Sequence, residues 1–258
     1  MVKIREAVMS SQFLMRRSMP RENLVMLRLS VLLTMLLLPV SAFAQPAQVV
    51  IARHGEKLDS YALCDIGTKR AQALAAQYLG RGATKSLFGA GHKPDAMLAM
   101  TMHTIETITP SAQSWNMPVT AYAVIPVPGG KGEAENEEEN QRTREAVHDL
   151  LNDPRYAGTT VVMVWEHKRI ASAKLEAKYP KEQVSLRQLF SLDQIADVPT
   201  EWPDENYDYF WIVDFAPGKT TPVSFHNRRQ EFSAPFDSLP ANSWNERDPS
   251  RKKAGCRE

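Results

Sequence analysis

Net charge, cysteine and long apolar runs are all scarce in this sequence, and each scarcity excludes a class of protein. The 31 Lys and Arg residues nearly balance the 30 Asp and Glu residues, for a formal net charge of +1 over 258 residues. A chain with this balance has no overall field to recruit a nucleic acid or an anionic membrane, so binding must depend on a local site. The sequence also lacks an HExxH motif and the Cys-His spacings typical of zinc sites.

The longest apolar run lies near the N-terminus and is typical of an export signal. Arg28 precedes the run 29–40, and Ser-Ala-Phe-Ala at 41–44 ends in an Ala-x-Ala cleavage signature. The run is shorter than the ~20 apolar residues of a membrane-spanning helix, and Pro39 interrupts it. We therefore expect cleavage after Ala44 and a periplasmic or secreted protein with no stable membrane anchor. An uncleaved anchor is the alternative.

The chain divides into three predicted parts. These are an N-terminal extension with its signal (1–44), one domain (45–232), and an irregular tail (233–258) rich in Pro, Ser, Asn and charge. Translation starts at Met1 or at Met26, since either fits the signal. With 43% apolar residues in the whole chain, the central part has enough material for one core.

Short apolar runs alternate with helical patterns, which is typical of an α/β sheet covered by helices. The predicted strands are 48–52, 96–100, 119–124, 159–165 and 207–215, and the predicted helices are 68–79, 143–151 and 170–179. The stretch 126–140 contains two glycines and a run of glutamates, so we expect a solvated loop there. We also expect Lys168 and Arg169 at the surface.

The two cysteines, Cys64 and Cys256, both follow the predicted cleavage point. Export would place them where disulfides persist, so they form either a disulfide between the start of the domain and the tail or two free thiols.

The first predicted strand leads directly into Arg53, His54 and Gly55. The carboxyl end of a buried parallel strand lies in the crevice where open α/β sheets bind ligands. An arginine fork suits phosphate oxygens, a neutral histidine can act as a nucleophile, and a glycine lets the backbone approach a bulky anion. The tripeptide therefore predicts a phosphate site.

A second apolar strand ends in Glu166, His167 and Lys168. If the two strands are parallel neighbours, His54 and His167 face one another across the mouth of the crevice. One histidine can then attack phosphorus while the other donates to the phosphate oxygens. Glu166 adjoins this pair, but neighbours on a strand point to opposite faces, so it is a candidate proton donor or a supporting group.

Several segments in order along the chain resemble the phosphoglycerate-mutase-like branch of the histidine phosphatase superfamily. They are 49–57 (VVIARHGEK), 65–71 (DIGTKRA), 106–112 (ETITPSA), 164–170 (VWEHKRI) and 202–214 (WPDENYDYFWIVD). The resemblance implies a three-layer α/β/α sandwich with a mostly parallel sheet. It also implies a phosphatase that needs no metal or other cofactor and acts on a phosphorylated small molecule or a phosphoprotein.

By the same resemblance, His54 would form a phosphohistidine while Arg53, Gly55 and His167 bind the phosphoryl group. A carboxylic acid would protonate the leaving oxygen, and the family places it in the region that here contains Glu133 and the glutamates after it.

One position departs from the family pattern. A second phosphate-binding arginine usually precedes the segment that 106–112 resembles, and this chain has His103 at that place. An imidazole offers fewer donors and less charge, and loss of one such donor can cost ~10²-fold in rate. This departure motivates one alternative, a degenerate protein that binds phosphorylated ligands with little or no turnover. Two further alternatives are a mutase and a metal site that uses His103 and Glu106 with His54 and His167.

We predict that the exported chain is cleaved after Ala44. N-terminal sequencing of the protein purified from its producing cells should then read Gln45 first. A cytosolic chain that still begins at Met1 or Met26 would contradict the export prediction.

Overall fold

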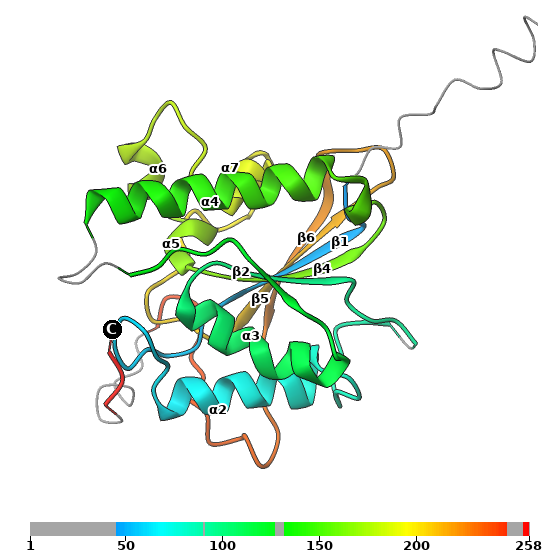
Figure 1. Cartoon of the computed structure of the whole chain (residues 1–258), viewed down its shortest axis with the longest axis vertical. Helices are drawn as coiled ribbons and strands as arrows, with labels where there is room; N and C mark the ends of the chain where they lie inside the picture. The colour runs from blue at the N-terminus through cyan, green and yellow to red at the C-terminus, as the bar shows by residue number, and fades with distance from the viewer. Residues whose placement is uncertain (1–44, 90, 127–131, 247–254, 258) are drawn as a thin grey trace, which may run out of the picture. The chain divides into compact units, whose positions relative to one another are not determined.

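The computed structural model describes residues 45–89, 91–126, 132–246 and 255–257, and the predicted signal segment 1–44 lies outside them. Within these residues, six strands form one sheet in the order β3-β2-β4-β1-β5-β6 (Figure 1). The strands are β1 (Gln48–Arg53), β2 (Ala96–Ala99), β3 (Val119–Ala121), β4 (Thr160–Trp165), β5 (Tyr209–Phe215) and β6 (Pro222–Arg229). Neighbours from β3 to β1 are parallel, while β5 runs antiparallel to both β1 and β6.

Helices cover both faces of this sheet, so the predicted three-layer α/β/α architecture with a mostly parallel sheet is confirmed. On one face lie α2 (Asp65–Leu74), its continuation η1 (Ala75–Leu79) and α3 (Met102–Trp115); on the other lie α4 (Glu133–Asn152), α5 (His167–Ile170), α6 (Ala173–Lys178) and α7 (Leu186–Leu189) (Figure 1). Two short 3-10 turns, η2 (Pro154–Tyr156) and η3 (Leu192–Gln194), complete the described elements. No helix of the described residues is long and apolar enough to cross a membrane.

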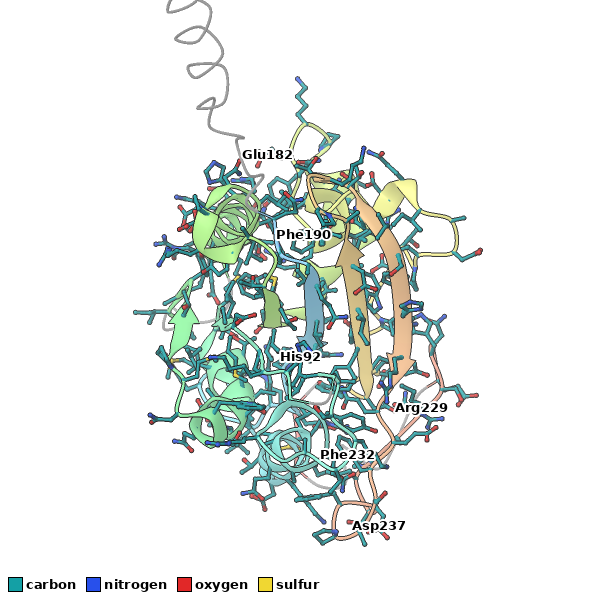
Figure 2. The ribbon with its side chains drawn as sticks, turned by 90° about the vertical axis from the view of Figure 1, so that its right-hand side faces the viewer. His92, Glu182, Phe190, Arg229, Phe232 and Asp237 are labelled. Atoms are coloured by element: carbon teal, nitrogen blue, oxygen red, sulfur yellow. A yellow bond between two sulfur atoms is a disulfide. The ribbon has the colours of Figure 1, made fainter. Side chains whose placement is uncertain are left out.

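The apolar run of β1 is continuous because both of its faces are buried. Val49 and Ile51 pack in the core that contains residues of α4, whereas Val50 and Ala52 pack in the core that contains residues of α2 and α3. Figure 2 shows the same division, with Phe190 on the α4 side and Phe232 on the α2 side.

The sheet order brings several polar segments to one edge. β2, β4 and β1 are parallel neighbours, so their carboxyl ends lie together, and the amino end of the antiparallel β5 joins them. The predicted pairing of the first strand with the strand before His167 is therefore confirmed, with Arg53 opposite Trp165.

The predicted solvated loop 126–140 is wrong from Glu133 onward, because α4 begins there. Its acidic residues are not all solvated: Glu139 is 1% exposed and lies 3.1 Å from the guanidinium of Arg169. Arg169, expected at the surface, is likewise buried. A cluster of glutamates resembles a loop in composition, but acidic residues also stabilise the first turn of a helix.

Other elements also differ from the sequence predictions. The predicted helix 170–179 overlaps the end of α5 and all of α6, and it is interrupted because Ser172 forms a bridge to Glu201 and its side chain caps α6. The strand β6 and the helices α3 and α7 were not predicted. β6 is a polar edge strand without an apolar run, so its sequence carries little strand signal.

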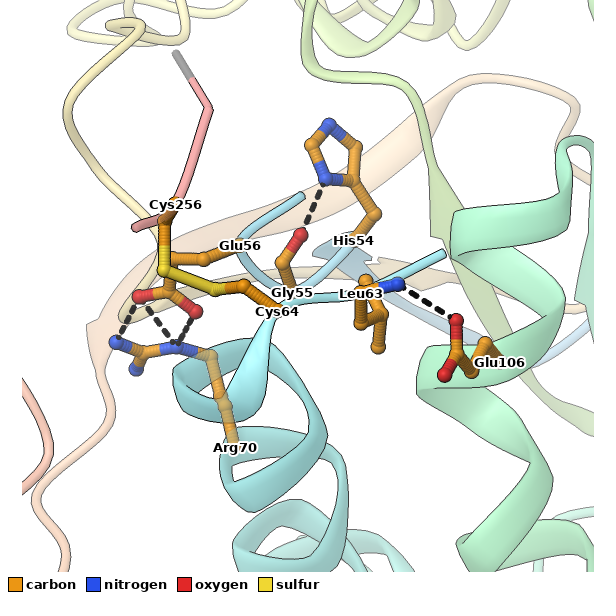
Figure 3. The surroundings of a disulfide bond; sticks show 8 residues. All are labelled: His54, Gly55, Glu56, Leu63, Cys64, Arg70, Glu106 and Cys256. Carbon is orange, nitrogen blue, oxygen red and sulfur yellow. Dashed lines mark hydrogen bonds and ion pairs between the residues drawn. A yellow bond between two sulfur atoms is a disulfide. The ribbon is translucent and has the colours of Figure 1, made fainter. Parts of the chain in front are cut away.

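A disulfide joins Cys64, just before α2, to Cys256 near the C-terminus, with their Cα atoms 5.5 Å apart (Figure 3). This separation lies in the usual range for disulfides. The bond fixes the described residues 255–257 beside the segment that follows β1.

Candidate active site

His54 directly follows β1 and is fully buried. Its Nδ1 lies 2.7 Å from the carbonyl oxygen of Gly55 (Figure 3). Because a carbonyl oxygen only accepts, Nδ1 carries the proton of the neutral ring and donates it, which leaves the lone pair on Nε2. Burial, with the positive charge of Lys57 nearby, holds the pKa of His54 well below its usual value despite the opposing effect of Glu166. The ring is therefore neutral near pH 7 and keeps a lone pair on Nε2.

Gly55 is required by backbone packing. A Cβ at this position would lie 2.9 Å from the carbonyl oxygen of Gly67 in α2, closer than real Cβ contacts occur. The Gly55 N–H donates to the Thr107 hydroxyl at 2.8 Å, so it is already occupied by α3. The glycine thus lets α2 pack closely beside His54, while its N–H is bound by α3. The approach of this backbone to an anion stays a prediction.

A buried carboxylate, that of Glu166, lies beside the free nitrogen of His54. Its Oε2 is 3.4 Å from Nε2 of His54. The Lys57 ammonium donates to both carboxylate oxygens at 3.0 Å each, and the Thr101 hydroxyl donates to Oε1 at 2.8 Å. Charge-assisted hydrogen bonds of this kind hold a carboxylate in one orientation.

Glu166 and His167 both lie close to His54 because neither residue belongs to β4. The strand stops at Trp165, Glu166 is the N-cap residue of α5, and His167 is the first residue of that helix. The expectation that they point to opposite faces of a strand therefore does not apply.

The second histidine, His167, lies with its ring centroid 5.9 Å from that of His54. Its Nε2–H donates to Oδ1 of Asp204 at 2.6 Å. Burial and the charge of Arg53 lower the pKa of His167 to about 3, although Asp204 opposes the shift. The same hydrogen bond holds the pKa of Asp204 below its usual value. The single N–H of a neutral His167 is thus occupied by an ionised carboxylate.

Arg53, the last residue of β1, is enclosed by the turn before β5. Its guanidinium lies over the ring of Tyr207, 3.7 Å from the centroid. One terminal nitrogen donates to three carbonyl oxygens, those of Pro203 at 3.2 Å, Asp204 at 2.6 Å and Asn206 at 3.3 Å. Its Nε is buried without a hydrogen-bond partner among the described residues, which leaves a donor for an anion.

His103 lies in the first turn of α3, with its ring centroid 6.0 Å from that of His54. Its Nε2 donates to the carbonyl oxygen of Asp59 at 2.8 Å. Burial, with the charge of Lys57, lowers the pKa of His103 to about 4, so the ring is neutral near pH 7 and its Nδ1 has no proton. In this arrangement His103 does not supply the charge or the donor of the arginine it replaces, and Lys57 is the cation nearby.

The other carboxylate considered from the sequence, Glu133, is exposed at the start of α4. It binds the Lys178 ammonium at 2.6 and 2.8 Å, and the Tyr179 hydroxyl, and these contacts lower its pKa. None of its contacts among the described residues involves a histidine, so Glu166 is the better placed of the two candidates.

The donor set of the site also has the spacing of a metal centre. Within the described part of the chain, ligand atoms that all lie within 4.8 Å of one another come from His54, Glu166 and His167. The rival metal site is not formed among the described residues, because neither His103 nor Glu106 belongs to this group. The Glu106 carboxylate instead accepts the Leu63 N–H at 2.8 Å. Two cationic side chains, Lys57 and Arg53, border this group, and the Lys57 ammonium is bound to the Glu166 carboxylate. Their positive charges oppose the binding of a divalent cation there.

Four residues of this cluster were not assigned a role from the sequence: Lys57, Thr101, Asp204 and Tyr207. Lys57 follows the Arg-His-Gly-Glu run directly and Asp204 belongs to the Trp-Pro-Asp run, so their place in the motifs was the available signal. Tyr207 lies in the same segment, 202–214, whereas for Thr101 the sequence offers no comparable signal.

No protein-family model matches the chain, and no curated protein matches its sequence. A solved structure from Agrobacterium tumefaciens, assigned as the phosphohistidine phosphatase SixA, is 12% identical with a TM-score of 0.34, over 70% of this chain and 97% of that one. A second, described as mycobacterial hydrolase 1, is 14% identical with a TM-score of 0.37, over 73% and 99%. Likeness at this level carries no argument about chemistry, so the functional assignment depends on the side-chain geometry.

Proposed function

We propose that this chain is an exported phosphatase that hydrolyses phosphomonoesters through a phosphohistidine at His54. One observation carries the proposal: the buried ring of His54 donates from Nδ1 to Gly55 and keeps the Nε2 lone pair. That lone pair lies at the edge of the sheet where Arg53, His167 and Glu166 also meet. A neutral histidine with cationic and hydrogen-bonding neighbours suits attack on phosphorus.

In the first step, Nε2 of His54 attacks phosphorus, the bond from phosphorus to the ester oxygen breaks, and that oxygen takes up a proton. We assign this proton transfer to Glu166, whose carboxylate lies 3.4 Å from Nε2. Phosphomonoesters have a second pKa of about 6, so the monoanion of the substrate can bring the proton that Glu166 passes to the leaving oxygen.

In the second step, water attacks the phosphorus of the phosphohistidine and gives a proton to Glu166. The bond from Nε2 to phosphorus then breaks, its electron pair returns to Nε2, and inorganic phosphate leaves. The free Nε of Arg53 would hold the non-bridging oxygens in both steps, and so would the N–H of His167 once the anion has displaced Asp204 from it.

The main alternative is a protein that binds phosphorylated ligands with little turnover, because His103 is neutral where an arginine is expected. The ammonium of Lys57 favours turnover, since it places a positive charge beside His54 and Glu166. The substrate class remains that proposed from the sequence, a phosphorylated small molecule or a phosphoprotein. Export is supported by the signal pattern and by the disulfide, which persists in oxidising compartments.

We predict that the mature chain releases phosphate from p-nitrophenyl phosphate and that His54→Ala lowers kcat by roughly a thousandfold or more. The matched control is His148→Ala, since that histidine is exposed and its ion-pair partner is Asp149, outside the site. Acid-labile phosphate should be trapped on His54 in the wild-type protein. EDTA should leave the rate unchanged, because the proposed reaction uses no metal.

If the folded protein bound phosphate but did not hydrolyse p-nitrophenyl phosphate, the result would favour the alternative of a binding protein. Activity that EDTA abolishes would instead favour a metal centre at the same residues.

We further predict that Asp204→Asn tightens the binding of vanadate, a phosphate analogue. The carboxylate of Asp204 occupies the N–H of His167, so an incoming anion must displace it. Removing this charge should lower the Kd for vanadate roughly tenfold, the equivalent of one charge-assisted hydrogen bond of about 1.4 kcal/mol.

Isothermal titration with the exposed Asp237→Asn as control measures the effect of this substitution. Weaker binding in Asp204→Asn would show that Asp204 supports the anion site and does not compete with the anion.

A further inference from the structure

The disulfide brings the C-terminal end of the described chain against the segment that carries the nucleophile. We call residues 255–257 the C-terminal strap. Cys256 is bonded to Cys64, and the N–H of Arg257 donates to the carbonyl oxygen of Lys57 at 2.6 Å. Lys57 therefore makes antiparallel bridges on two sides, one to Leu63 and one to Arg257.

The strand-like contacts of Lys57 lead directly to the reacting atoms. Its backbone is held by the strap, and its ammonium holds both oxygens of Glu166 at 3.0 Å. The Glu166 carboxylate in turn lies 3.4 Å from Nε2 of His54. Three contacts thus connect a covalently fixed tail to the nucleophile.

A second set of contacts fixes the other side of the same segment. The N–H of Cys64 donates to the carbonyl oxygen of Glu56 at 2.9 Å, and the carboxylate of Glu56 forms a fully buried ion pair with Arg70 at 2.7 Å (Figure 3). Residues 56 and 57 are thereby held between the start of α2 and the strap. Lys57 is the residue of the pair whose side chain points to the site, since it binds Glu166.

We propose that the C-terminal strap is a positioning element of the active site, which acts through Lys57 to hold Glu166 at the phosphoryl group. The inference rests on the proposed function for its effect on rate, but the contacts themselves do not. A proton donor must lie within hydrogen-bond reach of the leaving oxygen, and a small displacement of such a group is costly in rate. Oxidation of Cys64 and Cys256 then completes the site, in addition to stabilising the fold.

Two substitutions of Arg257 distinguish the effect of its backbone N–H from the effect of its side chain. Arg257→Pro removes the N–H that Lys57 accepts and keeps the disulfide, whereas Arg257→Ala keeps both. We expect Arg257→Pro to lower kcat roughly tenfold with KM within about twofold, and Arg257→Ala to stay close to wild type. The pH profile of kcat should shift in the first variant only, because the proton transfer by Glu166 is disturbed.

A double-mutant cycle with Lys57→Met tests whether the strap acts through Lys57. In that background Arg257→Pro should add almost no further loss, because the connection is already broken. Additive losses, or an Arg257→Pro variant with wild-type kcat and pH profile, would overturn the proposal. Cys64→Ser/Cys256→Ser, examined well below its melting temperature, should reproduce the Arg257→Pro effect if the proline variant does not fold.

The nitrogen NMR signals of the His54 ring give a readout that does not require activity. They should shift in Arg257→Pro and not in Arg257→Ala, because the Glu166 carboxylate faces Nε2. If the wild-type protein shows no phosphatase activity, the proposed function fails, while these signals still decide the role of the strap. Unchanged signals in both variants would contradict it.

Discussion

The hydrogen bond from Nδ1 of His54 to the carbonyl oxygen of Gly55 is the interaction on which the site depends. The acceptor is the backbone carbonyl of the next residue, so no other side chain is needed to orient the ring. The hydrogen bond places the proton of the neutral ring on Nδ1. The backbone that presents this carbonyl is itself fixed, because Gly55 packs against Gly67 and donates to Thr107. The position of His54, the proposed nucleophile, therefore follows from the packing of α2 and α3 beside the end of the first strand.

Burial keeps the histidines of this edge neutral, which has a consequence for acid stability. The pKa of His103 is lowered to about 4 and that of His167 to about 3, with the pKa of His54 also well below its usual value. In the unfolded chain these rings take up protons near pH 6.5, so the unfolded state binds more protons below that pH. Their contribution to stability is therefore present above about pH 6.5 and is lost as the pH falls toward 4. Burial of these histidines therefore keeps a lone pair free at neutral pH but makes the folded protein less stable in acid.

The sequence predicted the parts of the molecule whose signal is local. The five apolar runs gave five of the six strands, and the strand-to-motif transitions at Arg53 and Glu166 correctly located the edge where the two motifs meet. What failed was composition used as a guide to burial: Glu139 and Arg169 are polar enough for the surface, yet they pair with each other in the interior. Their partners are distant in sequence, so no local pattern could reveal the match.

The charge states of the site residues could not be predicted from the sequence either. His103 was expected to be partly cationic, but its neutrality depends on burial and on Lys57, which only the fold brings near. The same holds for Asp204, whose contacts with Arg53 and His167 depend on a turn that lies 150 residues away from the first motif.

The proposed function depends on the protonation state of the His54 ring, which long-range proton–nitrogen NMR of the 15N-labelled protein measures. We expect a ring with the proton on Nδ1 and a bare Nε2 that does not titrate near pH 6.5, because burial lowers its pKa. A ring protonated on Nε2, or one that titrates near its usual pKa of about 6.5, would contradict it.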